Sequence, residues 1–360
     1  MILDDFAPRI EAALRSLSVP GCSLAVVGAD GVREARGYGV ADLRENRPAT
    51  ETTDYHFCSV TKLLTATGIM RLAEQGRLGL EDEVARLLPE LGLPPGITVR
   101  QLLNHTSTLK DDYRVFLKAH FEGEAPPGLE RTLRGYQFRA TGAPGSRVSY
   151  CNTGFLLLGA LLERLGGKPV TEWMTGELLR PIDMKAGFRM LDPAVMARAA
   201  TGYFARWDLM KFLFRLGMPE LMRRLCATTV GPYTELRHYD LDATPIGGLV
   251  GSVLDFAAFL RDQLAEKSLL LGDASRKAMQ TLSVRGAAGM CSRLGVGLGW
   301  KLGEGRHGVF LNHEGGAPGY TTEVRIYPGR KLGIVFASNR FAKRISRAFH
   351  PVFDALADAP

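Results

Sequence analysis

The stretch HFCSVTKLLTATGIM, residues 56–70, places Ser59 three positions before Lys62 at the head of an apolar run. Residues i and i+3 of a helix share a face, with Cβ atoms about 5–6 Å apart, so the lysine can reach the serine hydroxyl. Two interpretations are open from this stretch alone. Ser59 is either a nucleophile with Lys62 beside it, or a helix N-cap followed by an exposed lysine.

The composition excludes several classes of protein. The 360 residues are 46% hydrophobic, which is enough for one large domain or two intergrown ones. The 45 Lys and Arg residues are interspersed with 38 Asp and Glu, so the net charge of +7 forms no basic tail and we expect no nucleic-acid partner. The longest apolar run, residues 155–162, is too short to span a bilayer, so we expect no stable membrane insertion.

The first residues and the cysteines bear on location. MILDDFAPRI lacks a basic segment followed by an apolar one, so we expect no signal peptide and a cytoplasmic protein, or a periplasmic or secreted one if a leader has been removed. The five cysteines are odd in number and include no C-x-x-C pair, which is typical of reduced thiols rather than a disulfide or zinc framework. They are Cys22, Cys58, Cys151, Cys226 and Cys291.

Hydrophobic periodicity predicts strands at both ends of the chain and helices between them. The expected strands are 21–28, 32–40, 309–315, 320–328 and 331–339, and the expected helices are 1–18, 59–75, 98–104, 153–165, 170–180, 207–225, 252–265 and 341–357. We therefore expect an α+β fold with a five-stranded antiparallel sheet built from both chain ends and flanked by the terminal helices. Residues 1–58 and 266–360 would form this sheet lobe, residues 59–265 a mostly helical lobe, with the active site in the cleft between them.

Ser-x-x-Lys is a weak motif, because it occurs twice: Ser59 with Lys62, and Ser107 with Lys110. Ser107 lies in a polar, loop-like stretch, whereas Ser59 follows a β-like segment and opens a helix. The N–H groups at a helix N-terminus suit a developing oxyanion. To act as a base near pH 7, Lys62 would have to lose about 3 units from its usual pKa of ~10.4, which burial could supply.

Two further motifs lie downstream. Tyr150-Cys151-Asn152 precedes an apolar helix, and this Tyr-x-Asn pattern occurs once; it is either catalytic or an Asx turn with a core tyrosine. His313-Glu314-Gly315-Gly316 ends a predicted strand, where glycines would let a substrate lie against the backbone.

The three motifs in this order resemble the serine β-lactamase and penicillin-binding-protein superfamily over about residues 5–350. Within it the chain is similar to the class C β-lactamase branch, which includes D-amino-acid peptidases and family VIII carboxylesterases. Further stretches that carry the likeness are 97–107, 247–260 and 295–300. The resemblance implies a β-lactamase/transpeptidase-like fold with no metal and no organic cofactor.

The resemblance also implies roles for individual residues. Ser59 would be acylated and Lys62 would help to activate it. Tyr150 would be the general base and the proton donor to the leaving group, and Asn152 would bind the acyl side of the substrate. His313, Gly315 and Gly316 would contact substrate as well. The backbone N–H groups of Ser59 and Gly316 would form the oxyanion hole.

One departure affects the expected substrate. His313 stands where many relatives have the lysine of Lys-Thr-Gly, and a histidine is a poorer anchor for a carboxylate. Strand alternation directs Glu314 away from the site. We therefore expect a serine hydrolase that acts on small carboxylic esters through an acyl-enzyme. The alternatives are a D-stereospecific peptidase or amidase, a β-lactamase, or a catalytically idle scaffold of the same fold. The oligomeric state and the physiological substrate are not predicted.

Three smaller expectations complete the sequence analysis. Lys62 should favour the Tyr150 phenolate, so that the two titrate as a coupled pair, and His313 could add a limb near pH 6.5. Trp300 either lines the acyl pocket or is an ordinary core residue. The basic, apolar segment 206–225 is either a helix of the inserted lobe, a lid, or a membrane contact.

Overall fold

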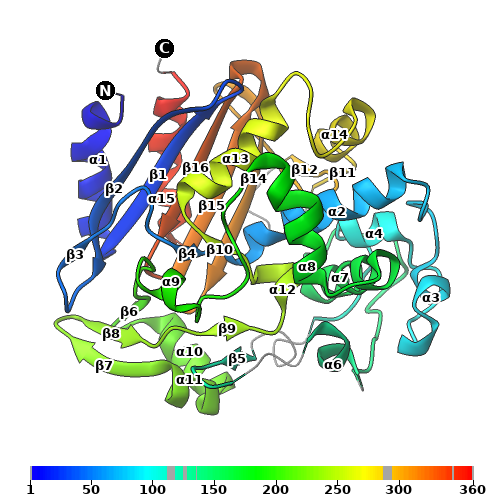
Figure 1. Cartoon of the computed structure of the whole chain (residues 1–360), viewed down its shortest axis with the longest axis horizontal. Helices are drawn as coiled ribbons and strands as arrows, with labels where there is room; N and C mark the ends of the chain where they lie inside the picture. Colours follow the sequence, from blue (N-terminus) through cyan, green and yellow to red (C-terminus); the bar gives the residue numbers. More distant parts are fainter. Residues whose placement is uncertain are drawn as a thin grey trace.

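A central antiparallel sheet joins the two ends of the chain (Figure 1), in a computed structural model that describes residues 2–111, 118–124, 128–134, 136–286, 294–342 and 344–358. Within these residues the strand order is β11-β12-β13-β14-β15-β16-β1-β2-β3. Their bounds are β1 Gly21–Gly28, β2 Val32–Asp42, β3 Arg47–Pro48, β11 Val284–Arg285, β12 Gly295–Val296, β13 Lys301–Gly305, β14 Gly308–Ala317, β15 Tyr320–Tyr327 and β16 Leu332–Ser338. The first strand pairs with the last, since Cys22 lies opposite Ser338.

The expected five strands are all present, but the count of five is wrong, because the sheet has nine strands among the described residues. The four additional strands are β3, β11, β12 and β13. Three of them have only two residues, too few to show a period of two, and β13 contains two glycines in five residues. Tertiary pairing at the sheet edges, rather than local pattern, makes these segments strands.

Both faces of the sheet are covered, which is why β1, β15 and β16 are buried at every position. Successive side chains of a strand point to opposite faces. Leu24 and Val26 accordingly join one apolar cluster with helices α1 (Ile2–Ser16) and α15 (Arg344–Leu356), while Ala25 and Val27 join the main core. α13 (Val253–Leu264) lies on this second face, where Leu260 meets the backbone of Gly333. Figure 1 shows the two terminal helices together on one side of the sheet.

The expected helices are present with small changes at their ends. The main ones are α2 Lys62–Glu74, α4 Val99–Leu103, α7 Asn152–Gly166, α8 Val170–Met174, α10 Leu209–Gly217 and α11 Pro219–Leu225. The helix predicted over 207–225 is two helices, because Met218, with φ of −143° and ψ of 63°, leaves the helical region before Pro219, where proline disfavours the helical conformation. The helix predicted over 170–180 stops at Met174 and continues as a π-helical turn over Thr175–Leu179.

Short elements fill the rest of the described chain. The helices are α3 Val84–Leu87, α6 Leu129–Leu133, α9 Pro193–Met196, α12 Thr244–Gly247 and α14 Asp273–Gln280. β4 (Tyr55–His56) pairs with β10 (Val250–Gly251), β5 (Ala119–His120) pairs with β9 (Asp240–Leu241), and a three-stranded sheet has the order β6 (Tyr203–Ala205), β8 (Tyr233–Leu236), β7 (Cys226–Val230). The division into a lobe of 1–58 with 266–360 and a lobe of 59–265 stays a prediction.

No helix among the described residues is long and apolar enough to cross a membrane.

Candidate active site

Ser59 lies in a short 3₁₀ turn, Cys58–Thr61, that joins β4 to α2. Two hydrogen bonds to the backbone of Phe57, the residue before the turn, fix its position. The Phe57 N–H donates to Leu249 O at 2.8 Å, and Thr322 Oγ1 donates to Phe57 O at 2.8 Å. Cys58 has φ of +52°, in the left-handed region that non-glycine residues rarely adopt. Such strain persists only where surrounding contacts impose it, and it often marks functional turns. The turn presents Ser59 half-buried at the head of α2.

Lys62 contradicts the alternative in which Ser59 is a helix cap beside a surface lysine. Thr61 precedes α2 and Phe57 precedes the 3₁₀ turn, so Ser59 holds neither cap position. Lys62 is fully buried, and its Nζ donates to Ser59 Oγ at 3.0 Å and to Ile246 O at 3.0 Å. Burial lowers the pKa of Lys62 to about 7, with nearby Asp111 opposing the shift and nearby Lys301 adding to it. In about half of the molecules Lys62 is therefore a neutral amine at pH 7.

The second Ser-x-x-Lys pair has a different environment. Ser107 is 1% exposed, and its Oγ accepts a hydrogen bond from the Leu109 N–H at 3.4 Å. Lys110, by contrast, is exposed to solvent. The buried Ser107 hydroxyl therefore has neither access to substrate nor a lysine that could act as its base. The structure thus distinguishes the two Ser-x-x-Lys motifs, which sequence context alone could only rank.

Tyr150 joins Ser59 and Lys62. Its hydroxyl is in hydrogen-bond contact with the Ser59 side chain, and Lys62 Nζ lies 5.2 Å from the centre of its ring. The His105 ring packs against the Tyr150 ring at an interplanar angle of 35°, with centroids 4.6 Å apart. Burial raises the pKa of Tyr150, and this effect outweighs the Ser59 hydrogen bond. The expectation that Lys62 makes the phenolate the favoured form is therefore wrong: the phenol stays protonated at neutral pH.

Asn152 begins α7, and a residue that the sequence analysis missed fixes it there. Asp111 Oδ2 accepts from both the backbone N–H and the side-chain amide of Asn152 at 3.0 Å, while Oδ1 accepts from the Thr153 N–H at 2.9 Å. A carboxylate at a helix N-terminus satisfies otherwise unpaired N–H groups. Cys151 Sγ accepts from the Gly154 N–H, so this cysteine is part of the cap rather than a simple core filler. Little in the sequence indicates this role for Asp111, because the residue lies in a polar, loop-like stretch 41 positions before Asn152.

β14 supplies the other wall of the site. β13 pairs with β14 only as far as Asn312, which lies opposite Lys301. Residues 313–317 pair with β15 on one side, and no strand within the described ranges pairs with their other side. His313 begins this free edge, with its ring centroid 6.3 Å from that of Tyr150. The edge thus runs past the three catalytic candidates.

His313 is fully buried, and its Nδ1 contacts Glu314 O at 2.9 Å. Burial, together with the charges of Lys301 and Lys62, lowers the pKa of His313 well below its usual range. The ring is therefore neutral at pH 7. His313 is therefore not expected to contribute the limb near pH 6.5 that the sequence suggested.

Lys301, which the sequence analysis did not single out, brings a fixed positive charge to this position. Its Nζ lies 5.3 Å from the centre of the Tyr150 ring and 3.5 Å from Glu314 Oε2. Its side chain is 9% exposed. The only sequence signal was its place after Trp300 in a stretch that resembles the superfamily. Lys301 thus brings a cation from the neighbouring strand to the free edge of β14, where the resemblance implied a lysine in place of His313.

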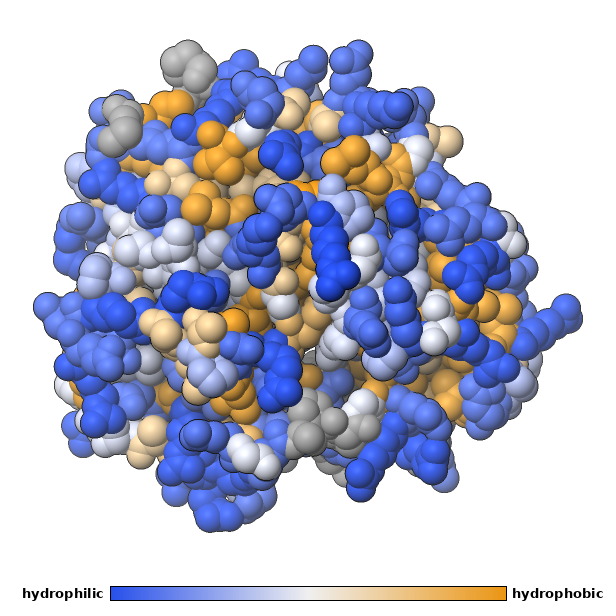
Figure 2. All heavy atoms as spheres, in the orientation of Figure 1, coloured by the Kyte–Doolittle hydropathy of each residue, from blue (hydrophilic) through white to orange (hydrophobic). Residues whose placement is uncertain are grey.

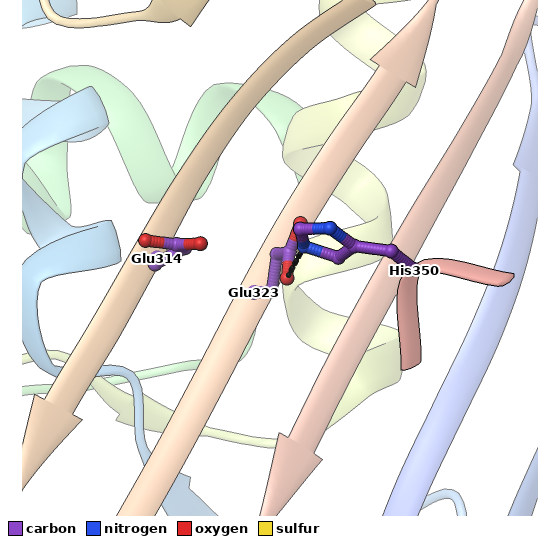
Figure 3. Close-up of side chains that lie close together, drawn as sticks. All are labelled: Glu314, Glu323 and His350. Carbon is purple, nitrogen blue, oxygen red and sulfur yellow. Dashed lines mark ion pairs between the residues drawn. The ribbon is translucent and has the colours of Figure 1, made fainter. Parts of the chain in front are cut away.

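Strand alternation directs the Glu314 side chain toward the opposite face of the sheet, but its Oε2 still lies 3.5 Å from Lys301 Nζ, beside the site. Its Oε1 accepts from Ser346 Oγ at 3.1 Å on α15. Figure 3 shows Glu314, Glu323 and His350 together on that face, with an ion pair between the last two. Their ligand atoms lie within 4.8 Å of one another, a spacing that would suit a metal. Glu323, however, already accepts from Arg325 at 2.8 Å and holds the Ser346 hydroxyl. This cluster therefore has the character of an ion-pair network.

The two glycines after Glu314 have steric causes. A Cβ on Gly315 would lie 2.5 Å from Phe57 O and 3.0 Å from Cys58 Cβ. Only glycine lets β14 approach the turn that carries Ser59 this closely. A Cβ on Gly316 would lie 2.4 Å from the Phe341 ring, on the other side. These contacts explain the glycines by packing, and their expected contacts with substrate stay predictions.

Two other features lie apart from the reacting groups. Trp300 is 1% exposed within the main core, which favours the core interpretation of this residue. A cavity of about 640 Å³ lies beside α7 and α8, lined by Glu163, Lys168, Arg180 and Asp242 among others, and includes none of the catalytic candidates. We place the active site at Ser59, and not at this cavity, because the candidate base and the candidate proton donor lie beside that serine.

Cys58 is buried with a raised pKa and stays a thiol, whereas Cys291 lies outside the described residues.

Comparisons with known proteins identify the family of the chain. The chain matches the Beta-lactamase family over residues 6–359. It belongs to that family. It is 29% identical over 333 residues to penicillin-binding protein 4* of Bacillus subtilis, an alignment that covers 89% of the chain and 68% of that protein. It is also 25% identical over 339 residues to protein flp of Staphylococcus aureus strain MW2, with 92% of the chain and 61% of that protein covered.

Similarity to solved structures supports the fold. The crystal structure of D-amino acid amidase from Ochrobactrum anthropi SV3, complexed with D-phenylalanine, superposes with a TM-score of 0.80. The sequences are 21% identical, and the alignment covers 99% of this chain and 100% of the amidase. The chain is thus a member of a serine hydrolase family with the β-lactamase/transpeptidase fold.

Proposed function

We propose that the protein is a serine hydrolase that cleaves small carboxylic esters through an acyl-enzyme on Ser59. The observation that carries the proposal is the 3.0 Å hydrogen bond between Lys62 Nζ and Ser59 Oγ, made by a lysine whose pKa is lowered to about 7. A buried amine that is half neutral at pH 7 can accept the serine proton without a large energetic penalty.

In this proposal the neutral Lys62 Nζ accepts the proton as Ser59 Oγ attacks the ester carbonyl. The backbone N–H groups of Ser59 and Gly316 hold the oxyanion. Tyr150 gives its proton to the departing alkoxide, and Lys62 returns a proton to Tyr150. A water molecule then repeats the sequence in reverse and frees the acid. The base role moves from Tyr150, where the sequence placed it, to Lys62, because burial raises the pKa of the phenol.

The preference for esters rests on charge at the free edge of β14. His313 is neutral, and Lys301 is shared with Glu314, whose carboxylate lies 3.5 Å away. The site therefore has little net positive charge for a substrate carboxylate, as a β-lactam or a peptide C-terminus would present. A neutral ester needs no such charge.

A D-amidase or D-peptidase is the second candidate, and Lys301 is the observation that favours it. Its ammonium group is 5.3 Å from the Tyr150 ring centre, so a substrate carboxylate that displaced Glu314 would meet a cation there. The D-amino acid amidase of the same fold, complexed with D-phenylalanine, supports this candidate. A cytoplasmic location stays a prediction.

The test is a panel of three substrates: p-nitrophenyl butyrate, a chromogenic cephalosporin and a D-alanyl dipeptide. We expect the highest kcat/KM for the ester, with Ser59→Ala as the matched inactive control for each substrate. A cephalosporin or dipeptide kcat/KM equal to or above that of the ester would overturn the ester proposal. If no substrate turned over and a serine-directed phosphonate failed to label the protein, the idle-scaffold alternative would hold.

A further inference from the structure

An apolar stripe on α10 faces solvent instead of the core. Among the described residues, the large hydrophobic side chains that are exposed number eight, and five of them lie within ten positions of the chain. These five form what we call the α10 patch: Trp207 (92% exposed), Leu209 (70%), Phe212 (57%), Leu213 (48%) and Leu216 (66%). On the face of the molecule in Figure 2, by comparison, apolar residues show as separate patches among hydrophilic ones.

The spacing of the patch is that of one helix face. Positions 209, 212, 213 and 216 are i, i+3, i+4 and i+7, so their side chains lie in one stripe. The opposite face of α10 is half-buried, and there Phe214 packs against Phe204 and Phe341 with centroids 6.2 and 6.0 Å apart. The helix is therefore anchored by one apolar face and exposes a second. Contiguous exposed apolar surface of this kind marks an interaction site.

Basic residues border the patch. Arg206 and Arg215 are exposed, and neither has a carboxylate within 4.0 Å in the described part of the chain. The nearby acids are already engaged: Asp208 caps α10 and pairs with Arg340 at 2.9 Å, and Glu220 pairs with Arg223. The local charge around the patch is thus positive.

We infer that the α10 patch binds the surface of an anionic lipid bilayer. The patch offers exposed apolar side chains beside cations that have no carboxylate partner in the described chain, a combination that matches the apolar interior and the negative head groups of such a bilayer. Amphipathic helices with a basic border lie in the interface of such membranes, and tryptophan is enriched at that depth. A second copy of the chain is disfavoured, because a symmetric pair would set Arg206 and Arg215 against their own copies.

The binding is peripheral. α10 has nine residues, about 14 Å of helix, which is less than half of a bilayer core of about 30 Å. Phe341, which packs on Phe214, is also the residue that a Cβ on Gly316 would strike. Docking through α10 therefore brings the free edge of β14 close to the membrane surface. The inference goes beyond the proposed function, because it does not depend on which bond is cleaved.

The test is flotation of the full chain with vesicles of phosphatidylglycerol and phosphatidylcholine at equal amounts, and with phosphatidylcholine alone. We expect at least tenfold stronger partition into the anionic vesicles, reduced by 0.5 M salt. Phe212→Ser with Leu216→Ser should reduce that partition at least tenfold and leave p-nitrophenyl ester hydrolysis unchanged, because both side chains are exposed. Arg206→Glu with Arg215→Glu should remove the preference for anionic lipid. Leu269→Ser with Val309→Ser, at exposed apolar sites elsewhere, is the control.

Tryptophan fluorescence gives a second readout. The chain has three tryptophans, and Trp173 and Trp300 are buried, so a blue shift on addition of anionic vesicles reports Trp207 entering lipid. The inference is overturned if partition is equal for the two vesicle types, or if the patch variant binds as the wild type does. It is also overturned if neither vesicle is bound and sedimentation velocity shows self-association that the Phe212→Ser, Leu216→Ser variant abolishes.

Discussion

Lys301 Nζ lies 5.3 Å from the centre of the Tyr150 ring, although the two residues are 151 positions apart in the chain. β13 begins at Lys301, which lies opposite Asn312, and the free edge of β14 begins at the residue after Asn312, His313. The ammonium group therefore stands at the junction of the sheet and the catalytic groups. Its charge lowers the pKa of Lys62, and that of Asp111 raises it, so two residues of opposite sign adjust the proposed base.

The pH dependence of kcat/KM should report these opposite effects of Lys301 and Asp111 on the pKa of Lys62. Neutral Lys62 is the active form, so kcat/KM for the ester should fall below an acid limb near pH 7. Lys301→Met removes a positive charge, which raises the pKa of Lys62 and moves the limb to higher pH. Asp111→Asn removes a negative charge and moves it to lower pH. At pH 6 we expect the Met variant to lose roughly two- to fivefold in kcat/KM relative to wild type.

Lys301→Arg is the control for that experiment, because it keeps the charge and should leave the limb in place. The measurement is kcat/KM between pH 5 and 9 at fixed ionic strength. Limbs that move in the same direction in the Met and Asn variants would contradict the electrostatic assignment.

Lys62 should weaken the fold that contains it. Its pKa is about 7 when folded and ~10.4 when unfolded, so between these values the unfolded chain binds more protons and stability rises with pH. Below pH 7 the full cost of the buried ammonium is present. Lys62→Met should therefore raise the free energy of unfolding at pH 6 by roughly 1–3 kcal/mol, less than the ~4 kcal/mol of a three-unit shift because two hydrogen bonds are lost.

The advantage of Lys62→Met should shrink as the pH rises from 7 to 10. Urea denaturation at pH 6 and pH 9 measures it. A variant less stable than wild type at both values would mean that the hydrogen bonds of Lys62 outweigh its desolvation.

Ser59, and not Ser107, should be the nucleophile. Ser107 is 1% exposed and Lys110 is on the surface, whereas Ser59 has its lysine at 3.0 Å. Ser59→Ala should lower kcat by several orders of magnitude, and Ser107→Ala by less than about tenfold. Peptide mapping after labelling with a fluorophosphonate gives the modified residue directly, and a label on Ser107 would refute the assignment.

Tyr150 should matter most for poor leaving groups. If it donates a proton to the departing atom, Tyr150→Phe should cost more for an amine leaving group than for p-nitrophenolate, which leaves without protonation. We expect a loss of roughly 10²–10⁴-fold in kcat for a D-amino-acid amide or alkyl ester, and a smaller loss for the p-nitrophenyl ester. Equal losses for the two would assign Tyr150 to proton removal from Ser59 instead.

His313 should not titrate in the working range. Burial and two lysines hold its pKa well below 6.5, so the neutral ring persists from pH 7 down through the usual range of histidine. His313→Gln should change the height of the pH profile but not its shape between pH 5.5 and 7.5. A limb near pH 6.5 that the Gln variant lost would show that the ring is charged there after all.

The sequence by itself determined most of the regular structure. The apolar runs in residues 21–28 and 331–339 predicted strands, and the same apolar content explains why both faces of β1 and β16 are covered. The three motifs at Ser59, Tyr150 and His313 predicted one site from positions that are 91 and 163 residues apart in the chain. Local pattern and motif chemistry carry this information because they depend on neighbours in the chain.

Tertiary structure decided the properties that neighbours in the chain do not encode, above all the pKa values of the site residues. Only burial by segments far away in the chain brings the pKa of Lys62 to about 7, raises that of Tyr150 and neutralises His313. Asp111 and Lys301 carry no local signal, because their importance comes from the groups that the fold sets within a few ångströms of them. The edge strands likewise exist through pairing alone. Charge interactions and desolvation depend on which groups are close in space, whereas a sequence motif reports only which residues are close in the chain.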